Sequence, residues 1–220
     1  MEGYVSNILN KYDVSKKAMT PATEMLFRSN ESCPKLSHKL QQIFHSCVME
    51  LHYLAKRTRG DILTAVSFCA TRVLSPNEDD FKKLARILSY LLFTKDQKMI
   101  LKVGETCEVK AYVDASFGIY EDMKSVTGIV IMIGEATIYV KSGKQKIVTR
   151  SSTEAELVGV SDALSQILWT REFLLHQGLR LGPATVYQDN KSTICLANKG
   201  VAYYVRSVHL VLHMYAHTYI

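Results

Sequence analysis

The stretch Glu108-Val-Lys-Ala-Tyr-Val-Asp114 decides the fold of the second half of this chain. Apolar and polar residues alternate along it, and β-branched and aromatic residues are common, which is the pattern of a half-buried β-strand. An acidic residue stands at its end. We therefore predict a strand that ends at Asp114 and presents a carboxylate at one edge of a sheet.

The segments downstream of this strand predict a mixed sheet with flanking helices, which is an α/β fold. The single tryptophan, Trp169, falls in the longest helix and is expected to pack under the sheet. The further strands are predicted at Val126–Ile133, Ala136–Val140 and Ala184–Tyr187, and the helices from Ser151 to about His176, over Lys191–Ala197 and over Val208–Thr218.

Two capping boxes compete at the start of the longest helix. Ser151 can pair with Glu154, or Thr153 can pair with Glu156. We favour the first arrangement because it leaves the carboxylate of Glu156 available for another role.

The first half of the chain is predicted to be a small all-helical segment. Apolar residues recur at helical spacing over Leu40–Leu54 and Ile62–Leu74. A third helix is expected to begin at Ser75-Pro-Asn-Glu78, with Ser75 as its cap. We therefore divide the chain into a helical segment, residues 1–106, and an α/β domain, residues 107–220.

The amino-acid composition favours some classes of protein and argues against others. The 220 residues are 47% hydrophobic and 22% charged, which suits a globular protein with a core of its own. No apolar run approaches a membrane span, and the N-terminus does not resemble a signal peptide. The five cysteines contain no Cys-x-x-Cys pair, so a disulfide framework is not expected. These features predict an intracellular protein that is not secreted and has no membrane partner.

The charge distribution favours a polyanionic partner for the first half. Residues 1–106 hold 16 of the 27 Lys+Arg but 11 of the 21 Asp+Glu, and three of these basic residues, Lys56, Arg57 and Arg59, lie within four positions. They are candidate phosphate contacts. The other interpretation, which we favour, is a solvated helix end at which positive charge complements the helix dipole.

Three carboxylates are predicted at the ends of secondary-structure elements. Asp114 and Asp189 each follow a strand, and Glu156 lies near the start of the long helix between these strands. Acids that converge at such an edge raise one another's pKa unless a divalent cation offsets their charge. Oxygen ligands suit Mg²⁺ or Mn²⁺, and two such ions can stabilise phosphodiester cleavage. Spacing alone leaves a second interpretation open, in which these residues only end turns and cap helices.

The ordered motifs Tyr112-Val-Asp-Ala-Ser, Lys124-Ser-Val-Thr-Gly, Lys144-Gln145, Ser151-Ser-Thr-Glu-Ala-Glu and Tyr187-Gln-Asp-Asn resemble the ribonuclease H domain of copia-type retrotransposon polyproteins. Upstream segments resemble the end of the reverse transcriptase palm and the connection that follows it. The resemblance covers nearly the whole chain.

This resemblance implies a ribonuclease H-like domain that hydrolyses the RNA strand of an RNA–DNA hybrid with two Mg²⁺ or Mn²⁺ ions. By position, Asp114, Glu156 and Asp189 match the family's metal-binding acids. The resemblance further implies a retroelement particle in the cytoplasm, or the nucleus, as the location, and the remainder of a reverse transcriptase polyprotein as a partner. Neighbouring small polar residues are candidate nucleic-acid contacts, namely Ser116, Ser152, Thr153 and Asn190.

Two departures from the family pattern qualify this expectation. The family places a fourth acid where this chain has Val211, and no Tyr-x-Asp-Asp polymerase motif occurs in the sequence. Valine cannot bind a metal ion, so we expect weakened hydrolysis and no polymerase activity from this chain. The alternatives are a catalytically inactive relic that still binds nucleic acid, or a fragment without activity.

Overall fold

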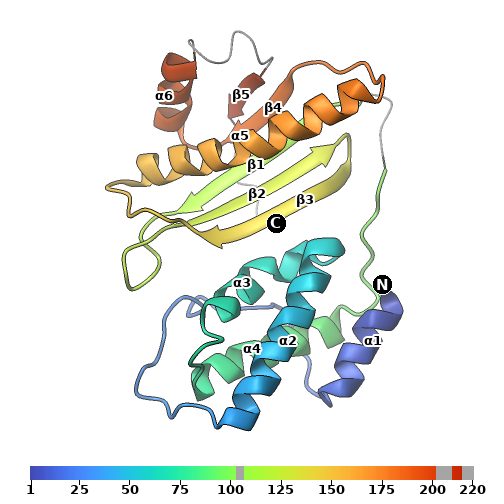
Figure 1. Cartoon of the computed structure of the whole chain (residues 1–220), viewed down its shortest axis with the longest axis vertical. Helices are drawn as coiled ribbons and strands as arrows, with labels where there is room; N and C mark the ends of the chain where they lie inside the picture. The colour runs from blue at the N-terminus through green and yellow to red at the C-terminus, as the bar shows by residue number, and fades with distance from the viewer. Residues whose placement is uncertain (103–106, 202–209, 215–220) are drawn as a thin grey trace. The chain divides into compact units, whose positions relative to one another are not determined.

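The structure, a computed structural model, describes residues 1–102, 107–201 and 210–214 (Figure 1). The chain divides into two compact units, Met1–Met99 and Ile100–Ile220, which we call unit 1 and unit 2. Among the described residues, no helix combines the length and the apolar character needed to cross a membrane.

Unit 1 is built from helices, as the sequence predicts. Its helix α1 was not among the predicted ones. Large apolar side chains from α2, α3 and α4, among them Phe44, Phe68 and Ile87, are fully buried and form its core. The helices are α1 (Glu2–Lys11), α2 (His38–Arg57), the short 3₁₀ turn η1 (Gly60–Ile62), α3 (Leu63–Thr71) and α4 (Glu78–Phe93).

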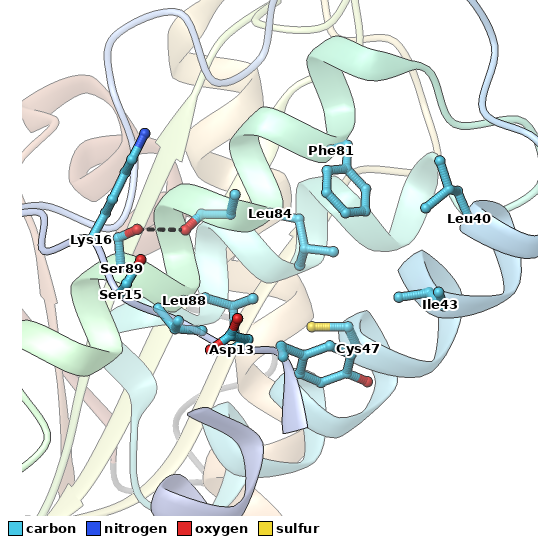
Figure 2. A pocket seen from close by; sticks show the side chains of 13 residues that line it. Asp13, Ser15, Lys16, Leu40, Ile43, Cys47, Phe81, Leu84, Leu88 and Ser89 are labelled. Atoms are coloured by element: carbon cyan, nitrogen blue, oxygen red, sulfur yellow. Dashed lines mark hydrogen bonds between the residues drawn. The ribbon is translucent and has the colours of Figure 1, made fainter. Parts of the chain in front are cut away.

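A pocket of about 330 Å³ lies in unit 1 between α2, α4 and the loop that follows α1. Figure 2 shows apolar side chains of both helices around it, among them Ile43 from α2 and Leu84 and Leu88 from α4. Asp13 and Lys16 of the loop also line this pocket. The pocket is mainly apolar, and the exposed side chains of Leu40 and Ile43 lie in its lining.

Helix α4 begins two residues later than the predicted cap implies, because Asn77 and not Ser75 caps it. The Asn77 side chain accepts a hydrogen bond from the backbone N–H of Asp80 at 3.0 Å, and the Asp80 carboxylate accepts one from the backbone N–H of Asn77 at 3.0 Å. Both side chains are fully buried. The capping box is therefore reciprocal and shielded from water.

Replacing Asn77 by alanine should lower the free energy of unfolding by about 1–2 kcal/mol, because a buried cap is lost. Chemical denaturation of the full chain, followed by circular dichroism, measures this change. Ser75→Ala is the matched control: Ser75 is exposed, and its substitution should cost less than about 0.5 kcal/mol. Equal losses from the two variants would contradict the assignment of Asn77 as the cap.

Unit 2 is an α/β unit with a mixed sheet, which confirms the predicted fold class. Within its described residues the strand order is β3-β2-β1-β4-β5. Strand β1 pairs antiparallel with β2 and parallel with β4. The elements are β1 (Val109–Ser116), β2 (Val126–Ile133), β3 (Ala136–Lys144), α5 (Ser152–His176), β4 (Ala184–Gln188), α6 (Lys191–Val201) and β5 (Leu210–Met214).

Helix α5 lies along one face of this sheet (Figure 1). Buried side chains of β1, β2, β4 and α5 form a single core there, with Val113, Ile131, Ile167 and Val186 among its members. Gly159 lies close to the sheet: a Cβ atom at this residue would lie 3.3 Å from methyl carbons of both Val113 and Thr127. A side chain there would require these methyl groups or the helix to shift slightly.

The predicted helix over Val208–Thr218 is wrong for the residues that the structure describes. Leu210–Met214 forms strand β5, parallel to β4, and residues 208, 209 and 215–218 lie outside the described ranges. Without β5, the backbone N–H and C=O groups on one side of β4 would lack sheet partners. That tertiary demand outweighs the helical interpretation of the local sequence.

The expected burial of Trp169 under the sheet is also wrong. Its side chain is 62% exposed and stacks on Phe173, with ring centroids 5.4 Å apart. Position 169 is two residues from the buried Ile167, which rotates it about 200° around the helix axis. Trp169 therefore points away from the face of α5 that covers the sheet.

Candidate metal centre

Asp114 is carried by β1, two residues before the end of that strand. Buried and half-buried residues alternate along β1, and Val113 belongs to the core under α5 while Asp114 is half-buried. Its register partner on β2 is Gly128, which has no side chain to cover the carboxylate. Strand alternation and a small neighbour therefore leave this acid accessible at the sheet.

Glu156 lies in the second turn of α5, and its carboxylate is held at both oxygens. Oε1 accepts a hydrogen bond from the backbone N–H of Ala115 at 3.0 Å, and Oε2 accepts one from Nε2 of Gln188 at 2.9 Å. Only 5% of the residue is exposed. Glu156 is thus a buried, oriented carboxylate beside β1.

The capping of α5 explains why Glu156 is available for this position. The Ser151 hydroxyl accepts from the backbone N–H of Glu154 at 3.2 Å, and Glu154 accepts from the backbone N–H of Arg150. Ser151 is therefore the cap, as in the first of the two arrangements considered from the sequence, but the box is not reciprocal because Glu154 accepts from Arg150 and not from Ser151. Glu154 is used at the helix terminus, and Glu156 is directed to the sheet.

Asp189 follows directly after β4 and completes a cluster of three acids. Ligand oxygens of Asp114, Glu156 and Asp189 all lie within 4.8 Å of one another. Parallel pairing of β1 with β4 brings the two aspartates to the same end of the sheet. In the described part of the chain, no other group of three or more potential metal ligands is found.

The chemistry of this cluster fits a hard divalent cation. Its three donors are all carboxylates, and oxygen ligands are those that Mg²⁺ and Mn²⁺ prefer. Each oxygen of Glu156 that accepts one hydrogen bond retains a second lone pair for a metal ion. The three residues could therefore hold a metal ion together.

The pKa of Glu156 is raised to about 7, first by burial and then by the neighbouring charges of Asp114 and Asp189, while the hydrogen bonds from Gln188 and Ala115 act to lower it. The ordinary pKa of a glutamate is about 4.5. In the absence of metal, the folded protein therefore binds more protons than the unfolded chain between about pH 4.5 and about pH 7. The contribution of Glu156 to the free energy of unfolding accordingly falls as the pH rises through this window.

Mn²⁺ binding should strengthen as the pH rises from about 5.5 to about 7 and then level off, because the ion displaces the proton from Glu156. The slope should not exceed about tenfold in affinity per pH unit if one proton is released. Calorimetric titration of the full chain in buffers of different ionisation enthalpy measures both affinity and proton release. An affinity that is constant across this range would contradict the assignment of Glu156 as a ligand.

The four small polar residues predicted to contact nucleic acid differ in how exposed they are and in whether their side chains are already hydrogen-bonded. Ser116 and Ser152 are exposed, and Thr153 is half-buried. The side chain of Asn190 is already engaged, because it accepts from the backbone N–H of Thr193 at 3.0 Å at the start of α6. Ser116 and Ser152 are therefore the more accessible of the four.

The three basic residues of unit 1 also differ. Lys56 and Arg57 are exposed, and the guanidinium of Arg57 lies over the ring of Tyr53. Arg59 is only 4% exposed; it forms an ion pair with Asp61 at 2.8 Å and donates hydrogen bonds to the backbone and hydroxyl oxygens of Thr94. The structure thus uses Arg59 to join the end of α2 to the end of α4, and its guanidinium is not presented to solvent.

Position 211 lies on β5, where its backbone pairs with that of Thr185, four residues before Asp189 in the sequence. At about 3.3 Å per residue, this register separates position 211 from Asp189 by about 13 Å along the strand direction.

Sequence reasoning missed Gln188. It is fully buried, donates to Glu156, and accepts from the backbone N–H groups of Asp189 and Asn190 at 2.8 and 3.1 Å. One signal was available in the sequence: Gln188 is a polar residue at the end of a strand, directly before Asp189. A polar side chain that is buried at such a position needs hydrogen-bond partners.

The sequence of this chain is similar to segments of Pol polyproteins from transposons. No protein-family profile matches the chain, and no solved structure matches it. The chain is 35% identical over 77% of its length to the retrovirus-related Pol polyprotein from transposon RE2 of Arabidopsis thaliana. It is 33% identical over 95% of its length to that from transposon RE1 of the same plant, and 28% identical over 95% to that from transposon TNT 1-94 of Nicotiana tabacum. The chain spans only 12%, 14% and 16% of these three relatives.

Proposed function

We propose that this chain, which is homologous to a segment of the Pol polyproteins of copia-type transposons, carries a ribonuclease H-like unit that hydrolyses RNA in RNA–DNA hybrids. The single observation that supports it most strongly is the cluster of Asp114, Glu156 and Asp189 within 4.8 Å. Unit 2 supplies this cluster, and unit 1 corresponds to the part of a reverse transcriptase that precedes it.

The three carboxylates have complementary roles in this proposal. Asp114 and Asp189 are half-buried, whereas Glu156 is buried and fixed by two hydrogen bonds. All three would hold Mg²⁺ or Mn²⁺. When bound, two such ions would stabilise the attacking and leaving oxygens of a phosphodiester. The site would then act as a metal-dependent endonuclease.

Exposed hydroxyl groups beside the cluster supply the expected contacts to the hybrid. Ser116 ends β1 after Asp114, and Ser152 begins α5 one turn before Glu156. Hydroxyl groups at these positions can donate to phosphate oxygens or exchange hydrogen bonds with the ribose 2′-OH, the group that distinguishes RNA from DNA. In unit 1, Lys56 and Arg57 remain candidates for sequence-independent phosphate contacts.

The test is cleavage of an end-labelled RNA–DNA hybrid by the full chain, with Mg²⁺ and separately with Mn²⁺. The expected result is shortened RNA with intact DNA, and no product when EDTA is present. An intact hybrid at high concentration of folded protein would overturn the proposed hydrolysis. Metal-independent binding of the hybrid that weakens steeply with salt would then favour the nucleic-acid-binding relic.

Introducing an acid in place of Val211 should not increase the rate of hybrid cleavage. We expect Val211→Asp to leave the cleavage rate within about threefold, because the register of β5 holds this position about 13 Å from Asp189 along the strand. The same hybrid assay measures the rate, and the melting curve of the variant controls for folding. A tenfold or larger gain would contradict the register and identify position 211 as the fourth ligand site.

A further inference from the structure

Gln188 links two of the three acids through a single side chain. Its amide group is fully buried, and both ends of it are used. Nε2 donates to Oε2 of Glu156 at 2.9 Å, while Oε1 accepts from the backbone N–H groups of Asp189 and Asn190 at 2.8 and 3.1 Å. The amide therefore connects helix α5 to the turn between β4 and α6.

This arrangement restrains Glu156 more than its helix alone can. Glu156 has three rotatable side-chain torsions, and its two oxygens contact different partners: the backbone of β1 at Ala115 and the side chain of Gln188 on β4. Two bonds from adjacent, parallel strands define the plane of the carboxylate. A carboxylate held in this way binds a metal ion without first losing rotational freedom.

The same amide restrains the backbone on which Asp189 is carried. The N–H groups of Asp189 and Asn190 point to one oxygen, so the chain must turn directly after β4. Asn190 then caps the first turn of α6 through Thr193. The direction in which the Asp189 side chain leaves the sheet is thus set by Gln188.

We propose that Gln188 is the positioning residue of the metal centre, holding Glu156 and Asp189 at the separation needed for one ion to bind both. This inference rests on the proposed function only in assigning metal binding to the three acids. Glutamine suits the role because one end of its amide donates and the other accepts. A residue that could only donate, or only accept, would leave one of the two acids unrestrained.

The first experiment measures Mn²⁺ affinity by calorimetric titration of the full chain. Gln188→Met keeps the length and approximate volume of the side chain but removes its donor and its acceptors. We expect the dissociation constant for Mn²⁺ to rise about 10–100-fold, the effect typical of removing a residue that orients metal ligands. If the chain cleaves hybrid, the cleavage rate of this variant should recover as Mn²⁺ is raised, with the KM for hybrid unchanged.

Gln145→Met is the matched control, because unit 2 contains a second buried glutamine that does not touch a carboxylate. Gln145 is 3% exposed, and its Nε2 donates to Thr127 and to the backbone oxygen of Ala155, both at 2.9 Å. Gln145→Met removes two hydrogen bonds against three for Gln188→Met, so it should lose folding stability to a somewhat smaller extent. Only Gln188→Met should change the Mn²⁺ dissociation constant by more than about threefold.

A second measurement needs no metal. Backbone amide hydrogen exchange, followed by NMR, should be slow at Asp189 and Asn190 in the unsubstituted chain. It should become at least about tenfold faster at these two residues in Gln188→Met, and remain unchanged there in Gln145→Met. This pattern would report the loss of the two hydrogen bonds to Oε1 directly.

The outcomes separate this inference from the proposed function. If the unsubstituted chain binds Mn²⁺ but does not cleave hybrid, the hydrolysis fails and the effect of Gln188→Met on Mn²⁺ affinity still decides the inference. If the chain binds no Mn²⁺, the proposed function and the positioning role both fail. If amide hydrogen exchange at Asp189 and Asn190 is the same in Gln188→Met as in the unsubstituted chain, Gln188 does not restrain the turn after β4. Equal Mn²⁺ affinity in Gln188→Met and the unsubstituted chain would overturn the inference.

Discussion

Replacing Asp114 by asparagine should reduce metal-dependent cleavage of RNA–DNA hybrid by about a thousandfold or more, which corresponds to about 4 kcal/mol of transition-state stabilisation. Asparagine keeps the size of the side chain but carries no charge, and only one of its two terminal atoms can bind a metal ion. Asp114 is half-buried, and its ligand oxygen lies within 4.8 Å of those of Glu156 and Asp189. The rate is measured by product formation from end-labelled RNA in the hybrid.

Asp162→Asn provides the control for loss of one negative charge from the same unit. Asp162 lies on the exposed side of α5 and forms a surface ion pair with Lys141 at 3.2 Å. Surface pairs of this kind contribute little to stability, so this variant should cleave at nearly the original rate. A folded Asp114→Asn protein that cleaves as fast as Asp162→Asn would exclude Asp114 from the metal centre.

Replacing Ile167 by alanine should lower the free energy of unfolding of unit 2 by about 2–5 kcal/mol. Ile167 is fully buried at the centre of the interface between α5 and the sheet. Its truncation removes transfer free energy and leaves a cavity in the core to which Val113 and Ile131 also belong. Since domains are stable by only about 5–15 kcal/mol, this is a large fraction of the total. Denaturant titration of the metal-free chain measures the change.

Trp169→Ala tests whether burial, and not side-chain size, determines this loss. Trp169 is larger than Ile167 and lies on the same helix, yet it is 62% exposed. We expect its replacement to cost less than about 1 kcal/mol, mainly through the stack on Phe173. Because it is the only tryptophan, both variants should be followed by circular dichroism and not by fluorescence. A larger loss from Trp169→Ala than from Ile167→Ala would mean that the orientation of α5 is different.

Much of unit 2 was predictable because its signals are local. The alternating pattern of β1 and the apolar run of β2 identify these strands within a few residues of their observed bounds. The Ser151 cap was predictable for the same reason, since a cap and the backbone N–H that it accepts from are only three positions apart. Once these elements were known, the three acids could be placed at strand and helix ends that an α/β sheet brings together.

Other features were not predictable because they depend on contacts between distant segments. Arg59 and its neighbours Lys56 and Arg57 form one basic run in the sequence, but only Arg59 is buried, through partners that include Thr94. Strand β5 exists in place of a helix because β4 offers an unpaired side to it. Neither partner can be identified from the local sequence.

The sequence by itself therefore determined the α/β class of unit 2, the helical character of unit 1 and the identity of three candidate acids. Periodicity and capping act over a few residues, so they can be recognised without knowing the rest of the fold. Only the tertiary structure decided that Glu156 is buried and bonded at both oxygens, and that Gln188 joins it to the turn at Asp189. The two hydrogen bonds of Glu156 join it to Gln188 and Ala115, which are 32 and 41 positions away in the sequence. Burial and hydrogen-bond partners are set by such packing and not by local pattern.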